Sequence, residues 1–285
     1  MKRRLPIART LLALVAVTVS LTLGVGTTAH AASLSQAKTI LTKTNYVALG
    51  DSFATGTGLG SYGSSGTCYR SSYAYPVVTS TSSGSADVTF LACNAATTAS
   101  IAGQLAQFSG DASKVLYVSL TVGGNDAGFT DALTRCLKLD DCSTDAAFTG
   151  AVAAKTDGVT AKIAANVAAI RATFPNAKII VTGYPKLFQQ PSSKSLCSVG
   201  SLLTLRKSEA NYLDNAAVSL NSAIKAGLSG ATYADVVTPF TGHGLCQGST
   251  SWVNSLNVLN TLGAFHPNKS GQSSGYATAV AAKVG

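Results

Sequence analysis

The chain has 285 residues, of which 46% are hydrophobic and 12% are charged, and its formal net charge is +9 at pH 7. The charged fraction is about half of that in an average soluble protein, whereas the apolar fraction is ordinary. This composition excludes a disordered chain, a collagen-like chain and a coiled coil, and the chain is long enough to bury a large core.

The first 31 residues have the organisation of a secretory signal peptide. Four Lys or Arg residues precede an apolar run over residues 11–25, and Ala29-His30-Ala31 offers the small-x-small pattern that a signal peptidase cleaves. The run is shorter than the ~20 apolar residues of a spanning helix, which disfavours a membrane anchor. We therefore expect export after removal of residues 1–31, and one domain formed by residues 32–285.

Much of the positive charge lies in that leader. Its removal leaves 17 Lys and Arg against 12 Asp and Glu, a net charge of +5. The remaining cations are scattered, with no basic run and no interleaved aromatic stripe, so we expect no nucleic-acid partner. A net charge of this size is compatible with, at most, peripheral contact with an anionic lipid surface.

Strand-like and helix-like segments alternate along the rest of the chain. Apolar, β-branched runs predict strands at residues 46–49, 88–92, 115–122, 178–182 and 232–237. Ala-rich segments predict helices at residues 98–108, 151–174, 202–228 and 270–284. The strands are hydrophobic throughout, which is typical of strands covered on both faces. The pattern predicts an α/β fold, a three-layer α/β/α sandwich with a central parallel sheet of about five strands.

Ligands of such sheets bind beyond the carboxyl ends of the strands, so the residues after each strand are the candidates for chemistry. Gly50-Asp51-Ser52 follows the first predicted strand, and Gly123-Gly124-Asn125-Asp126 follows the third. A serine at such a turn can present its hydroxyl and its backbone N–H, and an asparagine amide can donate to a developing oxyanion. The alternative is an ordinary turn with a helix cap.

Two histidines remain after the leader. Histidine is the usual general base for a serine hydroxyl, because its ordinary pKa lies near neutrality. His266 stands just before the last predicted helix and is followed by Pro267, which stiffens its loop. We expect His266 to be the base, and we expect His243, close to Cys246, to be structural or to line the rim of the site.

The six cysteines all lie in the exported part of the chain, where an oxidising compartment favours disulfides. Six cysteines allow fifteen pairings. Cys136 and Cys142 can close a local loop, and the other four would then pair most simply in sequence order. The spacing is not that of a zinc site and few histidines are present, so we expect no metal and no organic cofactor.

Together these segments resemble the SGNH (GDSL) hydrolases, specifically their secreted actinobacterial lipase/esterase branch, over about residues 46–276. The resemblance implies a flavodoxin-like fold, Ser52 as the nucleophile, Asn125 as an oxyanion donor and His266 as the base. It also implies three disulfides, Cys68–Cys93, Cys136–Cys142 and Cys197–Cys246.

Two positions depart from the family pattern. Ala95 fills the slot where the family usually presents a glycine N–H to the oxyanion; alanine keeps that donor but disfavours positive φ. The acid three residues before the histidine is replaced by Gly263. Some relatives use a main-chain carbonyl at that place, so we expect a Ser52–His266 dyad aided by the Gly263 carbonyl. Asp51 and Asp126 are expected to satisfy loop N–H groups instead.

The resemblance implies a secreted serine carboxyl-ester hydrolase, a lipase or esterase with phospholipase A activity as one variant, working through an acyl-enzyme on Ser52. The oxyanion donors would be the N–H groups of Ser52 and Ala95 and the Asn125 amide. The expected partner is a small-molecule or lipid ester, and the expected state is a monomer. The alternatives are an acyltransferase of the same fold and a non-catalytic secreted lipid- or carbohydrate-binding module.

Three further features are expected to have no catalytic role. Residues 271–275 match a G-x-S-x-G elbow, but no strand leads into them. Residues 58–63 match a dinucleotide fingerprint, but they begin eight residues after the strand and lead into no helix. Trp252 is expected to be a buried anchor or a cleft wall.

Overall fold

The structure, a computed structural model, describes residues 34–80, 87–138, 140–201, 203–257 and 261–285. The predicted signal peptide lies outside the described residues. Within these ranges no helix is both long and apolar enough to cross a bilayer.

Five parallel strands form the central sheet, in the order β2-β1-β3-β4-β7. Their bounds are Tyr46–Gly50 for β1, Thr89–Phe90 for β2, Tyr117–Thr121 for β3, Lys178–Thr182 for β4 and Thr232–Ala234 for β7. Strands β1, β3 and β4 are almost wholly buried, as their continuous hydrophobicity predicts.

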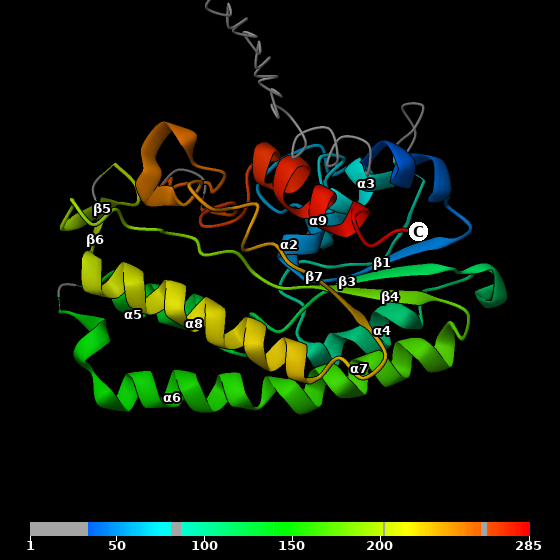
Figure 1. The fold of residues 1–285 in the computed structure, drawn as a ribbon, viewed down its shortest axis with the longest axis horizontal. Coiled ribbons are helices and arrows are strands. Elements are labelled where there is room, and N and C mark those ends of the chain that lie inside the picture. Colours follow the sequence, from blue (N-terminus) through cyan, green and yellow to red (C-terminus); the bar gives the residue numbers. More distant parts are fainter. Residues whose placement is uncertain (1–33, 81–86, 139, 202, 258–260) are drawn as a thin grey trace, which may run out of the picture.

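Helices cover both faces of the sheet, as Figure 1 shows, so the predicted α/β/α sandwich is confirmed. One face carries α2 (Ser52–Thr55), α3 (Tyr75–Ser80), the π-helical segment η6 (Gly271–Ala277) and α9 (Thr278–Ala281). The other carries α4 (Ile101–Leu105), α5 (Phe129–Cys136), α6 (Ala146–Asp157), α7 (Val159–Thr173) and α8 (Lys207–Ala226). Short 3-10 segments are η1 (Gly66–Cys68), η2 (Thr98–Ser100), η3 (Ala112–Lys114), η4 (Cys142–Thr144) and η5 (Leu245–Thr250).

Several predicted helices differ from the observed ones. The helix expected at residues 151–174 is two helices, α6 and α7, which meet at Gly158, and it begins earlier because the Asp145 carboxylate accepts the N–H of Phe148 at 3.0 Å. Such an N-cap fixes a helix start. The helix expected at residues 270–284 is π-helical before α9, and the one expected at 98–108 shortens to η2 and α4.

The helix expected at residues 202–228 begins only at Lys207. Residues 204–206 form strand β6 (Thr204–Arg206), which pairs antiparallel with β5 (Leu196–Ser198). The Glu209 carboxylate accepts the N–H of Arg206 at 2.7 Å and so sets the first turn of α8.

The structure contains three disulfides, Cys68–Cys93, Cys136–Cys142 and Cys197–Cys246, the set that the family resemblance implies. The first joins η1 to the segment after β2. The second joins the end of α5 to η4, and the third joins β5 to η5.

The register of β1 and β3 places their carboxyl ends side by side, because Gly50 pairs with Thr121. The N–H of Asp51 donates to the Thr121 carbonyl at 2.9 Å, which extends this pairing into the loop that carries Ser52. The buried Gln104 amide bonds both the N–H and the carbonyl of Gly50, each at 2.8 Å. The segment that carries Ser52 is therefore held both by β3 and by α4.

Gly50 cannot be replaced without moving this junction, since its φ is +132° and a Cβ there would lie 2.2 Å from the Thr121 carbonyl oxygen. We expect Gly50→Ala to lower the free energy of unfolding by about 2–4 kcal/mol. Chemical denaturation measures this loss. The control is Gly103→Ala in α4, where a Cβ meets nothing within 4 Å, so a stabilisation of up to about 1 kcal/mol is expected. Equal effects of the two substitutions would contradict this account.

Candidate active site

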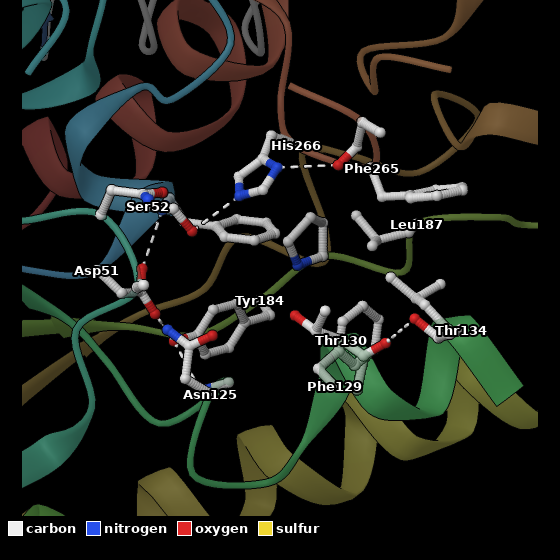
Figure 2. A pocket seen from close by; sticks show the side chains of 18 of the residues that line it. Asp51, Ser52, Asn125, Phe129, Thr130, Thr134, Tyr184, Leu187, Phe265 and His266 are labelled. Atoms are coloured by element: carbon white, nitrogen blue, oxygen red, sulfur yellow. Dashed lines mark hydrogen bonds between the residues drawn. The ribbon is translucent and has the colours of Figure 1, made fainter. Parts of the chain in front are cut away.

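A cavity of about 360 Å³ lies at the carboxyl ends of β1, β3 and β4. Figure 2 shows the side chains of Ser52, Asn125 and His266 at one end of it. They come from the turn after β1, the loop after β3 and the loop before η6. The structure therefore brings together three sequence segments that the motif analysis singled out.

The hydroxyl of Ser52 contacts the imidazole of His266. The Ser52 Oγ lies 2.7 Å from His266 Nε2, although the two residues are 214 positions apart. Ser52 begins α2 at a turn capped by Asp51, whose carboxylate accepts the N–H of Phe53 at 2.9 Å. This distance is within the range needed for a general base to accept the serine proton.

The other ring nitrogen of His266 has a main-chain partner. Nδ1 lies 2.9 Å from the Ala264 carbonyl oxygen. Since a carbonyl only accepts, Nδ1 carries the proton and Nε2 is free to accept from Ser52.

The prediction that the Gly263 carbonyl is the partner of Nδ1 is wrong. That carbonyl accepts the backbone N–H of His266 at 3.2 Å instead. The intervening Phe265 has a φ of +61°. The turn that it forms brings the Ala264 carbonyl, two residues before the histidine, to the ring in place of the Gly263 carbonyl, three residues before it.

Gly263 has a different contact, a close approach to Gly58. A Cβ at Gly58 would lie 2.2 Å from the Gly263 Cα, and a Cβ at Gly263 would lie 2.6 Å from the Gly58 Cα. Gly58, the first residue of the apparent dinucleotide fingerprint, therefore lets the histidine loop pack directly on the chain that follows α2. This contact accounts for a glycine in that segment without any nucleotide.

The three residues expected to supply oxyanion donors, Ser52, Ala95 and Asn125, all line the cavity. Within the described part of the chain, the backbone N–H groups of Ser52 and Ala95 have no acceptor. The Asn125 amide donates one hydrogen to the Ala96 carbonyl at 2.8 Å, which fixes the amide and leaves its second hydrogen available. Such unpaired, preoriented donors can stabilise an oxyanion.

Comparison with known proteins agrees with this geometry. Residues 48–273 match the model of the GDSL-like lipase/acylhydrolase family. The chain belongs to this family. Lipase 1 of Streptomyces coelicolor is 35% identical over 261 residues, which cover 90% of this chain and 93% of the relative.

Two solved structures are also similar to this chain. The extracellular lipase of Streptomyces rimosus has 34% identity and a TM-score of 0.73, covering 83% of this chain and 98% of its own. Phospholipase A1 of Streptomyces albidoflavus has 33% identity and a TM-score of 0.74, and the match covers 85% of this chain and 100% of that structure. The chain is a carboxylic ester hydrolase of the GDSL-like family.

The two aspartates of the family motifs hold loops in place, as predicted. Asp126 accepts the N–H and the hydroxyl of Thr98 at 2.8 and 2.6 Å, and Lys162 lies 3.1 Å from its carboxylate. Asp51 accepts hydrogen bonds from Phe53 and Tyr184. Burial raises the pKa of the Asp51 carboxyl to about 7, although both of these hydrogen bonds lower it.

His243 does not line the cavity. Its ring stacks on Trp252 with centroids 3.8 Å apart, and its Nδ1 lies 2.7 Å from the Thr250 carbonyl oxygen. The structural role predicted for His243 is confirmed, and Trp252 serves as its packing partner.

A cluster of Asp141, Cys142 and Glu209 has the donor types of a metal site. The Cys142 sulfur is bonded to Cys136, so the cluster offers no thiolate.

The end of the cavity away from Ser52 in this GDSL-like hydrolase is mainly apolar. Helix α5 contributes Phe129 and Leu133 together with Thr130 and Thr134, and Leu137 directly follows the helix. The opposite wall includes Leu187 and Phe265. The sequence analysis missed α5, although Phe129, Leu133 and Leu137 recur every four residues and mark one helical face. It also missed Tyr184, which comes two residues after β4 and lines the cavity.

The ionisation of His266 is testable. Burial lowers the pKa of the imidazole below its ordinary value of 6.5, while the hydrogen bond to the Ala264 carbonyl partly opposes the shift. The ring is therefore neutral, and able to act as a base, at neutral pH. We expect an NMR titration of the ring protons, assigned by comparison with His266→Ala, to give a midpoint below 6.5. A midpoint above 6.5 would contradict the desolvated environment.

Ala95 occupies a backbone conformation that favours glycine, with a φ of +60°. We expect Ala95→Gly to raise the free energy of unfolding by about 1 kcal/mol, because the left-handed conformation costs alanine about that much. Turnover should stay within about twofold, since the N–H donor remains. The matched control is Ala99→Gly in η2, which should lose stability. A loss of stability in Ala95→Gly comparable to that in the control would contradict the left-handed conformation of residue 95.

Proposed function

We propose that this protein is a secreted serine carboxyl-ester hydrolase that forms an acyl-enzyme on Ser52. The single observation that carries the proposal is the 2.7 Å contact between Ser52 Oγ and His266 Nε2 at the mouth of an apolar cavity. A hydroxyl alone is a weak nucleophile, and an adjacent base is what activates it.

In the proposed mechanism, His266 Nε2 takes the Ser52 proton as Oγ bonds to the ester carbonyl carbon. The resulting oxyanion accepts hydrogen bonds from the N–H groups of Ser52 and Ala95 and from the Asn125 amide. Collapse of this intermediate breaks the bond to the alcohol, which leaves with the proton from His266. Water then repeats the sequence on the acyl-enzyme and releases the acid.

The Ala264 carbonyl orients the His266 imidazole, which is the role of the aspartate in the usual triad. It holds the imidazole in the tautomer with the proton on Nδ1, and its dipole stabilises the imidazolium that forms transiently. A carbonyl carries no full charge, so this dyad relies more on the oxyanion donors than a triad does.

The shape and lining of the cavity support an ester with an acyl chain. Its volume of about 360 Å³ lies within the range of small-molecule sites. The apolar side chains Phe129, Leu133, Leu187 and Phe265 would bury the acyl chain. Since the similar solved structures are a lipase and a phospholipase A1, lipid esters, including phospholipids, are the proposed substrates.

Secretion is supported by the three disulfides and by the extracellular relative. We infer removal of residues 1–31 and a single catalytic domain over residues 32–285, acting as a monomer. An acyltransferase would differ only in using an alcohol where this mechanism uses water. A non-catalytic binding module would gain nothing from an activated serine.

The test is hydrolysis of nitrophenyl esters from acetate to palmitate, with a phospholipid alongside. We expect Ser52→Ala and His266→Ala to abolish turnover, and Asn125→Ala to lower kcat about 10²–10³-fold through loss of one oxyanion donor. His243→Ala is the matched control and should keep near wild-type turnover. Wild-type rates from a folded Ser52→Ala protein, or no ester cleavage by the wild type, would refute the proposal.

A further inference from the structure

The geometry points to Tyr184 as a positioning residue, whose hydroxyl fixes the nucleophile segment and the oxyanion segment relative to each other. This inference rests on the proposed function, because it concerns the alignment of Ser52 with Asn125. Tyr184 lies in the loop that follows β4, the strand next to β3 in the sheet.

One buried oxygen atom bridges the two segments. The Tyr184 hydroxyl donates to the Asp51 carboxylate, and it accepts the N–H of Gly124 at 2.9 Å. Asp51 immediately precedes Ser52, and Gly124 immediately precedes Asn125. Figure 2 shows the hydroxyl end of Tyr184 directed toward Asp51. The hydroxyl thus ties together the two loops that supply the nucleophile and the side-chain oxyanion donor.

The backbone of Tyr184 is itself held from the opposite side. Asn221, a buried residue of α8, accepts the Tyr184 N–H and donates to the Tyr184 carbonyl, both at 2.8 Å. The preceding Gly183 makes room for this pair, because a Cβ there would lie 2.2 Å from the Asn221 Oδ1. The hydroxyl of Tyr276 also donates to the Gly183 carbonyl at 3.0 Å. The tyrosine is therefore anchored to α8 and to η6.

The ring of Tyr184 is confined as tightly as its polar atoms. It packs edge-on against Phe53 with centroids 5.1 Å apart, and Phe53 in turn lies 5.0 Å from the His266 ring. A Cβ at Gly124 would come within 3.1 Å of the tyrosine ring. The glycine before Asn125 leaves the space that Tyr184 fills, so loop and ring cannot move independently.

The consequence for catalysis follows from the sensitivity of oxyanion binding to geometry. The hydroxyl already has two partners, and neither is Ser52 or His266. It therefore acts through the position of other groups. Without it, the Gly124 N–H and one Asp51 oxygen lose their hydrogen-bond partner. No shared partner then fixes the two loops relative to each other. Displacements near 1 Å at a reacting centre cost on the order of 10²-fold in rate.

The test compares Tyr184→Phe with Tyr212→Phe in the full protein, using a nitrophenyl ester. Tyr212 is the matched control, because its hydroxyl has no hydrogen-bond partner in the described structure and its ring packs on Phe148, outside the cavity lining. For Tyr184→Phe we expect kcat to fall about 10- to 100-fold with KM within about threefold, because the ground-state pocket stays intact. For Tyr212→Phe we expect no change in either constant.

A second readout separates positioning from a loss of folded protein. A boronic acid that adds to Ser52 mimics the tetrahedral intermediate, so its inhibition constant should weaken in proportion to kcat/KM in Tyr184→Phe. A smaller active fraction would leave that constant unchanged. If Tyr184→Phe does not fold, Asn221→Ala, which removes the backbone anchor and keeps the hydroxyl, should show the same selective loss of kcat.

The outcomes are distinguishable. Unchanged kcat in a folded Tyr184→Phe protein, beside an active wild type, would overturn the role of Tyr184 and leave the esterase proposal standing. An equal loss in Tyr212→Phe would also overturn it, since removal of any partly buried tyrosine hydroxyl would then suffice. A wild type that cleaves no ester would refute the proposed function and this inference together.

Discussion

The contact between the Ser52 hydroxyl and the His266 imidazole is the interaction on which the rest of the site depends. It joins residues 214 positions apart, so no local sequence preference can produce it. The parallel sheet sets one partner at the end of β1, and the close approach of Gly58 to Gly263 brings in the other. Both glycine positions are places where even a methyl group would separate the two loops.

The polar groups around this contact are fixed before any substrate binds. Asn125 is held by the Ala96 carbonyl, His266 by the Ala264 carbonyl, and Asp51 by Phe53 and Tyr184. Buried polar groups that are fully hydrogen-bonded make a site rigid, whereas unpaired ones make it costly. Among the residues that the structure describes, none accepts from the N–H groups of Ser52 and Ala95, which is the arrangement expected of donors available to an oxyanion.

The parts of this protein that depend on short-range patterns could be predicted from its sequence. Strand β4 was placed at its observed bounds, and Ser52, Asn125 and His266 were each found beside an element end. The details that depend on tertiary packing were not accessible. The His266 Nδ1 contacts the Ala264 carbonyl and not that of Gly263, because Phe265 adopts a positive φ. The role inferred for Tyr184 depends on its contacts with Asp51 and Gly124, which lie 133 and 60 positions away in the sequence.

The most direct test of the central contact is labelling by a fluorophosphonate, read by mass spectrometry of the intact protein and its peptides. Phosphonylation requires a serine oxygen that a neighbouring base has activated. The account predicts a single adduct on Ser52 in the wild-type protein, and an adduct formed at least about 10²-fold more slowly in His266→Ala. An adduct on another residue, or an equal rate in the two proteins, would contradict it.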